Sequence, residues 1–264
     1  MLTQMSNPLV LVINMDRSHD RLQSITTHLD AQSIPFQRIQ AIDGSKTDLS
    51  KLADAEGYRR CHGRDLRASE VGCYVSHLKA MTAFLETSET ACVIFEDDAR
   101  VCDDFIALVS EIIARNLCGF DMLRLQGRRQ GLGLTQVRAD RWSIKVHATR
   151  VTGSTAYVLT RKAAQRYLEK LPPMIVPFDH AFDRALHLGL RLGAVLPYPV
   201  GIADVPSTIE TSVTTRRYGK ATGIARWPVM AWRTQTEIAR ALACIAEIPR
   251  IKSASRRAVR STKP

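Results

Sequence analysis

Short apolar runs alternate with amphipathic segments through the first 200 residues of the chain. Runs with the length and branched side chains of buried strands occur at Leu9–Ile13, Ala91–Phe95, Phe120–Leu125 and Ala156–Thr160. Apolar residues recur at helical spacing in the segments Ser18–Leu29, Ser69–Leu85, Phe105–Ile113, Arg161–Leu171 and Pro177–Leu188. Strands that alternate with helices predict an α/β sandwich with a mostly parallel central sheet.

Weaker strand patterns occur at Phe36–Ile42, Val146–Val151 and Leu192–Val200. The last of these is interrupted by prolines, which predicts a strand at an edge of the sheet. Residues 127–133 are glycine-rich and basic, and we expect a flexible loop there.

The composition becomes basic after residue 210, where one amphipathic helix is expected before Pro249. The net charge of the chain is +11, and residues 211–264 hold nine arginines and three lysines against two glutamates. We therefore expect a nearly neutral main domain over residues 1–210 and a basic tail over residues 211–264, its last dozen residues disordered. Charge confined to a tail favours an anionic surface as partner and argues against a nucleic-acid-binding body.

No apolar run reaches the roughly 18 residues that span a bilayer, and no signal-peptide pattern is seen. The six cysteines form no CxxC pair. Together these features predict a cytoplasmic protein with reduced thiols.

The strongest chemical signal is the acidic cluster Glu96-Asp97-Asp98, which directly follows a predicted buried strand. Ligands of α/β sheets bind at the carboxyl ends of strands. Three adjacent carboxylates repel one another, and a divalent cation such as Mn²⁺ or Mg²⁺ would relieve that repulsion. The alternative is a solvated acidic turn that caps the next helix.

Several blocks of the sequence resemble glycosyltransferase family 25, which includes lipooligosaccharide galactosyltransferases and their collagen-modifying relatives. The matching blocks are Val12–Arg21 ("INLDRxxDR"), Ile34–Gly44 ("IPFxRxxAxDG"), Ser69–His77 ("xEIGCxxSH"), Glu96–Asp98 ("EDD"), Gly153–Thr160 ("GTxAYxIS") and Pro177–Asp183 ("PxDxxLD"). They cover roughly residues 9–200 in the expected order, so the match is specific. Met15 and Ala99 depart from the family pattern without touching the chemistry.

The resemblance implies a GT-A-type nucleotide-binding fold and a nucleotide-sugar donor, most often UDP-galactose. It also implies transfer to a lipooligosaccharide or similar glycolipid acceptor with inversion at the anomeric carbon. Under this hypothesis Asp98, helped by Asp97, holds the metal ion, and Glu96 supports them or contacts the ribose.

The matched blocks also suggest residues for the donor site. Asn14, Asp16 and Arg17 follow the first strand, where a nucleotide would lie, and the turn residue Asp43 belongs to the same group. Arg21 either meets a phosphate or pairs with Asp16 or Asp20.

Four further residues complete the predicted donor site, each with a structural alternative. Ser76 and His77 lie on the helix before the metal strand, where His77 either serves the donor or is a satisfied buried histidine. Cys73 and His77 have the spacing of a zinc pair, but no second pair supports zinc. Gly153 and Tyr157 either allow the sugar to approach the backbone or only shape a turn.

Inversion requires a base that takes the proton of the acceptor hydroxyl. Asp179 is the first candidate because it stands at a helix start, where it could instead be a simple N-cap. Asp183 and His180 are the rivals.

The remaining expectations concern the tail and other functions. Arg226–Arg260, with Trp227 and Trp232, is expected to attach to the cytoplasmic face of an anionic inner membrane, the alternative being a solvated tail. The alternatives in function are transfer of another sugar such as glucose, a metal-dependent phosphohydrolase, or a non-catalytic family member.

Overall fold

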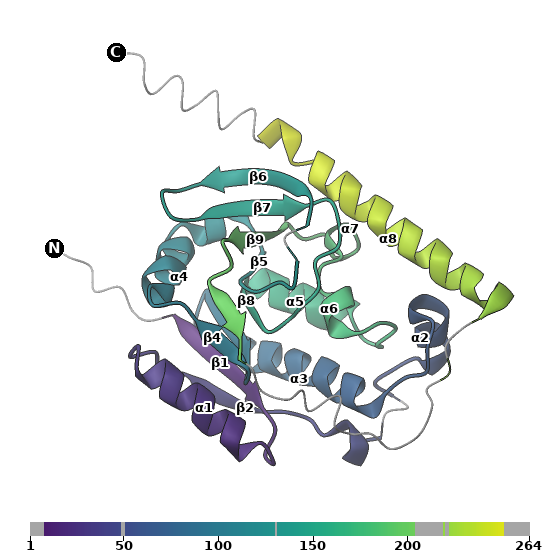
Figure 1. Cartoon of the computed structure of the whole chain (residues 1–264), viewed down its shortest axis with the longest axis horizontal. Helices are drawn as coiled ribbons and strands as arrows, with labels where there is room; N and C mark the ends of the chain where they lie inside the picture. Colours follow the sequence, from purple (N-terminus) through teal and green to yellow (C-terminus); the bar gives the residue numbers. More distant parts are fainter. Residues whose placement is uncertain (1–7, 49–50, 130, 204–218, 220–221, 251–264) are drawn as a thin grey trace.

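The computed structural model describes residues 8–48, 51–129, 131–203, 219 and 222–250 of the chain. An eight-stranded sheet forms the centre, with helices on both faces and a two-stranded sheet beside it (Figure 1). In order across the large sheet, the strands are β2 (Gln37–Gln40), β1 (Leu9–Asn14), β3 (Ala91–Glu96), β8 (Ala156–Thr160), β5 (Met122–Arg124), β9 (Leu192–Leu196), β7 (Ser143–His147) and β6 (Gly133–Arg138). The small sheet pairs β4 (Ala99–Val101) with β10 (Val200–Ile202).

The sheet is mixed in strand direction. β1 runs parallel to β2 and β3, and β5 runs parallel to β9. β8 lies antiparallel between β3 and β5, and β7 is antiparallel to both of its neighbours. The α/β class is therefore confirmed, with antiparallel strands inserted among those that run in the common direction.

The helices are α1 (His19–Asp30), α2 (Ala55–His62), α3 (Ala68–Leu85), α4 (Phe105–Ala114), α5 (Arg161–Lys170), α6 (Phe178–Ala181), α7 (Ala185–Leu188) and α8 (Trp227–Ile245). Short 3₁₀ turns are found at Gly44–Lys46, Asn116–Gly119 and Gly223–Arg226.

Alternate residues of the central strands supply two apolar layers. Leu11 and Ile13 of β1 pack in the layer that contains α2, α3, α5 and α6, whereas Val10 and Val12 pack in the layer that contains α1 and α4. Because both faces are covered, the central strands are apolar at nearly every position, which explains the continuous runs in the sequence.

One strand prediction was wrong. The segment around Leu192–Val200 is not an edge strand, because β9 pairs with β5 on one side and with β7 on the other. Its prolines, Pro197 and Pro199, come after β9 ends at Leu196, so they do not interrupt its hydrogen bonds. The edges of the large sheet are β2 and β6, and β6 begins at Gly133, the last residue of the segment predicted as a loop.

The amphipathic helix expected in the tail is α8, and it packs on the body of the molecule (Figure 1). Val229 and Cys244 are buried in that contact. The boundary expected at residues 210–211 and the last dozen residues lie outside the described part of the chain. Among the described helices, none has the length and apolar character needed to cross a membrane.

Candidate functional site

The neighbouring parallel strands β1 and β3 end beside each other, which brings the polar residues at their carboxyl ends together. In their register Ile13 of β1 lies opposite Glu96 of β3, so Asn14 and Asp97 follow at the same edge. Asn14 is buried, and its side-chain amide donates a hydrogen bond of 2.7 Å to Asp97 Oδ2. Its second hydrogen bond, to the carbonyl of Ser18, fixes the start of α1 against this turn.

Arg21 of α1 lies between the two aspartates of the acidic turn. Its guanidinium forms an ion pair with Asp97 Oδ1 and lies 3.4 Å from Asp98 Oδ2. The sequence left open whether Arg21 meets a phosphate or pairs with Asp16 or Asp20; in the folded chain Arg21 forms ion pairs with Asp97 and Asp98. The cation instead offsets part of the repulsion within the acidic cluster.

Asp98 remains the least satisfied carboxylate of the cluster. Burial, together with the neighbouring charges of Glu96 and Asp97, raises the pKa of Asp98 to about 7. Its Oδ1 atom is buried and has no hydrogen-bond partner among the described residues. These properties fit a ligand for a hard divalent cation, which would supply the missing positive charge.

Glu96 belongs to a separate polar chain that crosses the interior. Its Oε1 accepts a hydrogen bond of 2.8 Å from Ser154 and lies 3.5 Å from His77 Nε2. The other ring nitrogen of His77, Nδ1, is 3.0 Å from the hydroxyl of Tyr157. Although burial opposes it, these contacts with His77 and Ser154 keep the pKa of Glu96 below its usual value.

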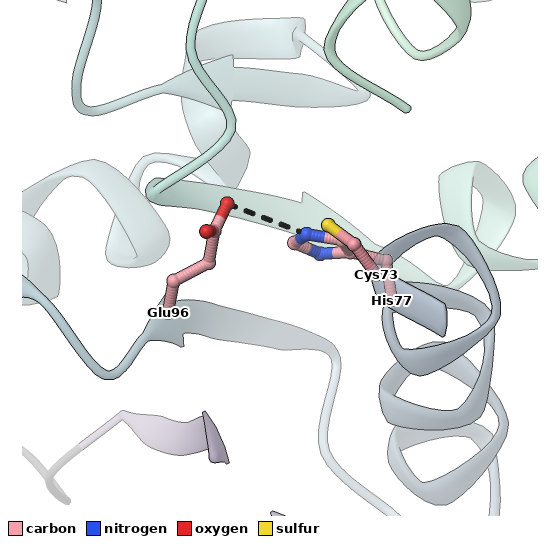
Figure 2. Close-up of side chains that lie close together, drawn as sticks. All are labelled: Cys73, His77 and Glu96. Carbon is pink, nitrogen blue, oxygen red and sulfur yellow. Dashed lines mark ion pairs between the residues drawn. The ribbon is translucent and has the colours of Figure 1, made fainter. Parts of the chain in front are cut away.

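The thiol of Cys73 lies close to Glu96 and His77. One ligand atom each from Cys73, His77 and Glu96 lies within 4.8 Å of the others (Figure 2). Burial and the nearby carboxylates, Glu96 first among them, raise the pKa of Cys73 well above its usual value. The group could hold a metal ion only at the cost of ionising this thiol, so it fits Mn²⁺ or Mg²⁺ less well than Asp98 does.

A pocket of about 350 Å³ opens beside the ends of β1 and β2. Asp16, Arg17 and Asp43, all predicted donor-site residues, line this pocket together with Lys46 and Lys79. The volume is within the range of small-molecule sites.

The charged side chains of the pocket are held in place by one another. Arg38 lies 2.5 Å from Asp16 Oδ1, and Arg17 pairs with Asp43. Hydrogen bonds, chiefly from Arg38, lower the pKa of Asp16, and those from Ser45 lower the pKa of Asp43. Both carboxylates are therefore ionised at neutral pH, which suits recognition of hydroxyl groups.

Ser76 links the pocket wall to α3. Its hydroxyl accepts a hydrogen bond of 2.8 Å from the amide of Ile42 and donates one of 2.6 Å to the carbonyl of Gly72. The backbones touch here: a Cβ atom on Gly72 would lie 2.5 Å from the Ile42 carbonyl, and one on Gly44 would lie 1.8 Å from the Ala68 carbonyl. The glycines of two matched blocks therefore permit this close packing.

Asp179 lies on α6, next to the chain of Glu96 and His77. The ring of its neighbour Phe178 stacks on the ring of His77 at a centroid distance of 4.0 Å. Burial first, and then the charges of Glu96 and Asp179, raise the pKa of the Cys73 thiol well above its usual value. The N-cap of α6 is Pro177, so Asp179 is not the simple helix cap that the sequence left open.

Asp183, the rival base, is held between two buried arginines. Arg240 of α8 donates a hydrogen bond of 3.0 Å to Asp183 Oδ1, and Arg124 of β5 lies 3.6 Å from Oδ2. Arg124 also donates to the carbonyl of Gly153. This arrangement favours a structural role for Asp183, as the anchor of α8.

Sequence reasoning missed Arg124 and Arg240. Arg124 follows two apolar residues in a fully buried strand, and a charge at such a position was a usable signal that a buried partner exists. Arg240 had no comparable signal, because the tail contains many arginines.

The fold and the site together define an α/β protein with a polar site at the carboxyl ends of parallel strands. The model of glycosyltransferase family 25 (LPS biosynthesis protein) matches residues 7–182, and the chain belongs to this family.

The chain is also similar to several curated proteins. A glycosyltransferase 25 family member of Aedes aegypti is 24% identical over 183 residues, which are 64% of this chain and 29% of the relative. Procollagen galactosyltransferase 1 of Danio rerio is 25% identical over 182 residues, which are 64% of this chain and 30% of the relative. A probable inactive family member 3 of Bos taurus is 28% identical over 173 residues, 62% of this chain and 29% of the relative. The chain thus matches about three tenths of the length of these relatives.

Proposed function

We propose that this protein is an inverting glycosyltransferase that moves a sugar, galactose in the first instance, from a UDP-sugar to a glycan acceptor. The observation that carries the proposal is the position of the acidic turn. Glu96, Asp97 and Asp98 follow β3 beside the end of β1, where Asn14 and Arg21 hold Asp97. Membership of family 25 supports sugar transfer, and the name of the Danio rerio relative supports galactose.

The nucleotide belongs in the pocket beside β1 and β2, in the manner of a GT-A fold. Asp16 and Asp43 would accept hydrogen bonds from ribose or base, while Arg17, Lys46 and Lys79 would attract the diphosphate. Ser76 supports the pocket wall from α3. Gly153 precedes β8 and Tyr157 lies on it, and β8 pairs with β3 on the side opposite β1.

A divalent ion, Mn²⁺ or Mg²⁺, fits the donor set of the acidic turn. Asp98 would be the principal ligand through its buried Oδ1, with Asp97 assisting, and Arg21 already neutralises part of the cluster. Such an ion would stabilise the negative charge that develops on the leaving diphosphate.

We assign the role of general base, which acts on the acceptor, to Asp179. This carboxylate takes the proton from the acceptor hydroxyl while the hydroxyl oxygen forms a bond to the anomeric carbon of the donor sugar. The bond from that carbon to the diphosphate breaks on the opposite face, and the nucleoside diphosphate leaves with the electron pair. His180 then positions Asp179, and Asp183 anchors α8, rather than accepting the proton.

A glycolipid acceptor would place the enzyme on the cytoplasmic face of an anionic inner membrane, and α8 supports this partner. Its outer side exposes apolar residues that repeat along one stripe, Trp227, Met230, Ile238, Leu242 and Ile245. The sequence after this helix holds cations without acidic residues from Arg250 to Lys263, which complements anionic lipids.

Sedimentation with vesicles tests the membrane partner. The intact chain should sediment with phosphatidylglycerol-containing vesicles and not with purely zwitterionic ones. Ile238→Ser/Leu242→Ser should lose most of this binding, whereas Ala243→Ser, on another side of α8, should not. Equal binding of the double variant would exclude the stripe.

Release of nucleotide from a panel of nucleotide sugars tests the catalytic proposal. The intact chain should turn over one UDP-sugar when Mn²⁺ or Mg²⁺ is present and not after chelation. Absence of turnover and of nucleotide binding across the panel would place this chain with the inactive members of the family.

A further inference from the structure

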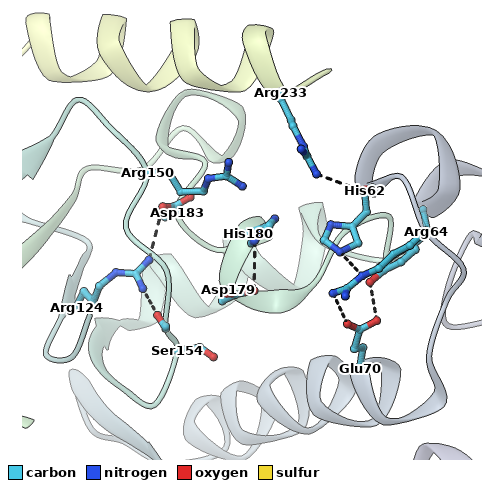
Figure 3. A network of polar contacts seen from close by, with 12 residues as sticks. His62, Arg64, Glu70, Arg124, Arg150, Ser154, Asp179, His180, Asp183 and Arg233 are labelled. Atoms are coloured by element: carbon cyan, nitrogen blue, oxygen red, sulfur yellow. Dashed lines mark hydrogen bonds and ion pairs between the residues drawn. The ribbon is translucent and has the colours of Figure 1, made fainter. Parts of the chain in front are cut away.

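A second concentration of positive charge surrounds His180, the residue after the proposed base. Figure 3 shows Arg150 and Arg233 on two sides of His180, with His62 and Arg64 close by. The rings of His62 and His180 have their centroids 5.3 Å apart, so α2 and α6 meet here. Arg233 comes from α8, which closes the group from above in the figure.

The side chains line a small open pocket of about 10 Å³, far smaller than the pocket beside β1 and β2. Its walls are formed by Arg150, His180, Trp232, Arg233, Thr236, Glu237 and Arg240. None of these residues lines the pocket beside β1 and β2 that we assign to the nucleotide. The two concentrations of cations are therefore separate features of the molecule.

Three of the acidic residues around this pocket are bound to arginines other than Arg150 and Arg233. Glu237 accepts a hydrogen bond of 2.7 Å from Arg240, and Glu70 accepts one of 2.8 Å from Arg64. Asp183 is held by Arg240 and Arg124. Glu237, Glu70 and Asp183 are thus held by cations other than Arg150 and Arg233, whereas Asp179 remains beside His180.

Arg150 and Arg233 keep donors for a ligand. Arg150 lies 3.7 Å from Glu237, a carboxylate that Arg240 holds more closely. Arg233 donates a long hydrogen bond of 3.4 Å to the carbonyl of His62, and among the described residues it has no carboxylate partner. Guanidinium groups in such pairs are suited to carboxylate and phosphate ligands.

The lowered pKa values of His62 and His180 are consistent with an excess of positive charge around them. Burial and the surrounding arginines lower the pKa of His62 to about 3, and burial is also the main cause that lowers the pKa of His180. Both rings are neutral at pH 7. The Nδ1 atom of His180 is buried and has no hydrogen-bond partner among the described residues.

We infer that Arg150, Arg233 and His180 bind an acidic group, a carboxylate or a phosphate, on the acceptor saccharide. The inference rests on the proposed function, because His180 Nε2 lies 4.0 Å from Asp179, whose task would be to meet the acceptor hydroxyl. An acidic group held here keeps the acceptor beside that carboxylate. The enzyme would then prefer acidic saccharides to neutral ones.

Binding of simple sugars tests the inference independently of turnover. Glucose, glucuronate and glucose 6-phosphate are titrated at constant ionic strength and followed by ligand-observed NMR. The intact chain should bind at least one of the acidic sugars about tenfold more tightly than glucose, equivalent to about 1.4 kcal/mol. Tighter binding of glucuronate would indicate a carboxylate ligand, and tighter binding of glucose 6-phosphate would indicate a phosphate ligand.

Three variants complete the test. Arg150→Gln/Arg233→Gln should lose the preference while UDP affinity stays unchanged, and Arg150→Lys/Arg233→Lys should keep part of it. Arg166→Gln, on the exposed surface of α5, is the matched control. Equal affinity for acidic and neutral sugars overturns the inference, as does weaker UDP binding in the glutamine variant, which would make this the site of the donor phosphates. If no nucleotide sugar is turned over but the acidic preference is present, only the proposed reaction fails.

Discussion

The imidazole of His77 and the ring of Phe178 lie 4.0 Å apart and only 3° from parallel. The contact joins α3 to α6, elements separated by about 100 residues of sequence. It fixes the backbone that carries Asp179 next to the polar chain of Glu96, His77 and Tyr157. The stacked pair therefore connects the proposed base to the donor side of the site.

Replacing Phe178 by leucine should affect catalysis more than stability. The smaller side chain costs about 1 kcal/mol of stability, because volume is nearly conserved but the aromatic contact is lost. A displaced Asp179 should lower kcat by at least about tenfold. Phe84→Leu, in the same apolar layer, should lower stability similarly and leave kcat unchanged. Equal kcat in the two variants would show that the stacking does not position the base.

Asparagine substitutions should distinguish the role of Asp179, on α6, from that of Asp183, which follows the C-terminal end of α6. Asp179→Asn removes the base, so kcat should fall about 10²- to 10⁴-fold with little change in unfolding. Asp183→Asn leaves Arg124 and Arg240 buried without their anion, so the free energy of unfolding should fall by about 3 kcal/mol. Chemical denaturation and steady-state kinetics measure both. A stable but inactive Asp183→Asn would instead make Asp183 the base.

Gly72→Ala should be strongly destabilising even though alanine favours helices. The added Cβ would meet the backbone carbonyl of Ile42 at 2.5 Å, and backbone cannot move aside as a flexible side chain can. We expect a loss of about 2 kcal/mol or more, measured by urea denaturation. Gly201→Ala is the control, because its Cβ would have no neighbour nearer than 3.8 Å. Similar stability of both variants would mean that α3 and the Ile42–Gly44 loop are not in tight contact.

His62 should make the protein less stable in mild acid. Its pKa is about 3 in the folded chain against an ordinary value of 6.5, so only the unfolded chain takes up a proton between these values. The stabilisation is complete above pH 6.5 and is lost as the pH falls towards 3. Because the His62 side chain is partly exposed, we expect this proton uptake to lower the free energy of unfolding by only about 1 kcal/mol at pH 5. His62→Gln should therefore lose less stability than the intact chain between pH 7 and pH 5, and an identical loss would contradict this assignment.

The sequence predicts the central strands well because they are covered on both faces. Ala156–Thr160 was predicted with its observed bounds, and the runs at Leu9 and Ala91 were found for the same reason. The hairpin of β6 and β7 was poorly predicted, because the residues of β6 are only half-buried and carry no clear period. Strand direction leaves no periodic signal either, so the antiparallel position of β8 could not be read from the pattern.

The candidate site was predicted as a set of residues but not as a set of partners. Local spacing offered Asp16 or Asp20 to Arg21, whereas the fold supplies Asp97 and Asp98, far along the chain. Asp183 looked equivalent to Asp179 in the sequence until Arg124 and Arg240 were found on either side of it. Such long-range pairs depend on the packing of separate elements, which one sequence does not record.

The most direct test of the account is metal-dependent turnover of a UDP-sugar by Asp98→Asn, compared with the intact chain and with Asp103→Asn. Asp103 is exposed on the same stretch of chain and makes a matched control. We expect Asp98→Asn to fold but to lose Mn²⁺-dependent release of UDP by at least about 100-fold, while Asp103→Asn keeps it. Undiminished, metal-dependent turnover by Asp98→Asn would contradict the assignment of the acidic turn as the catalytic metal site.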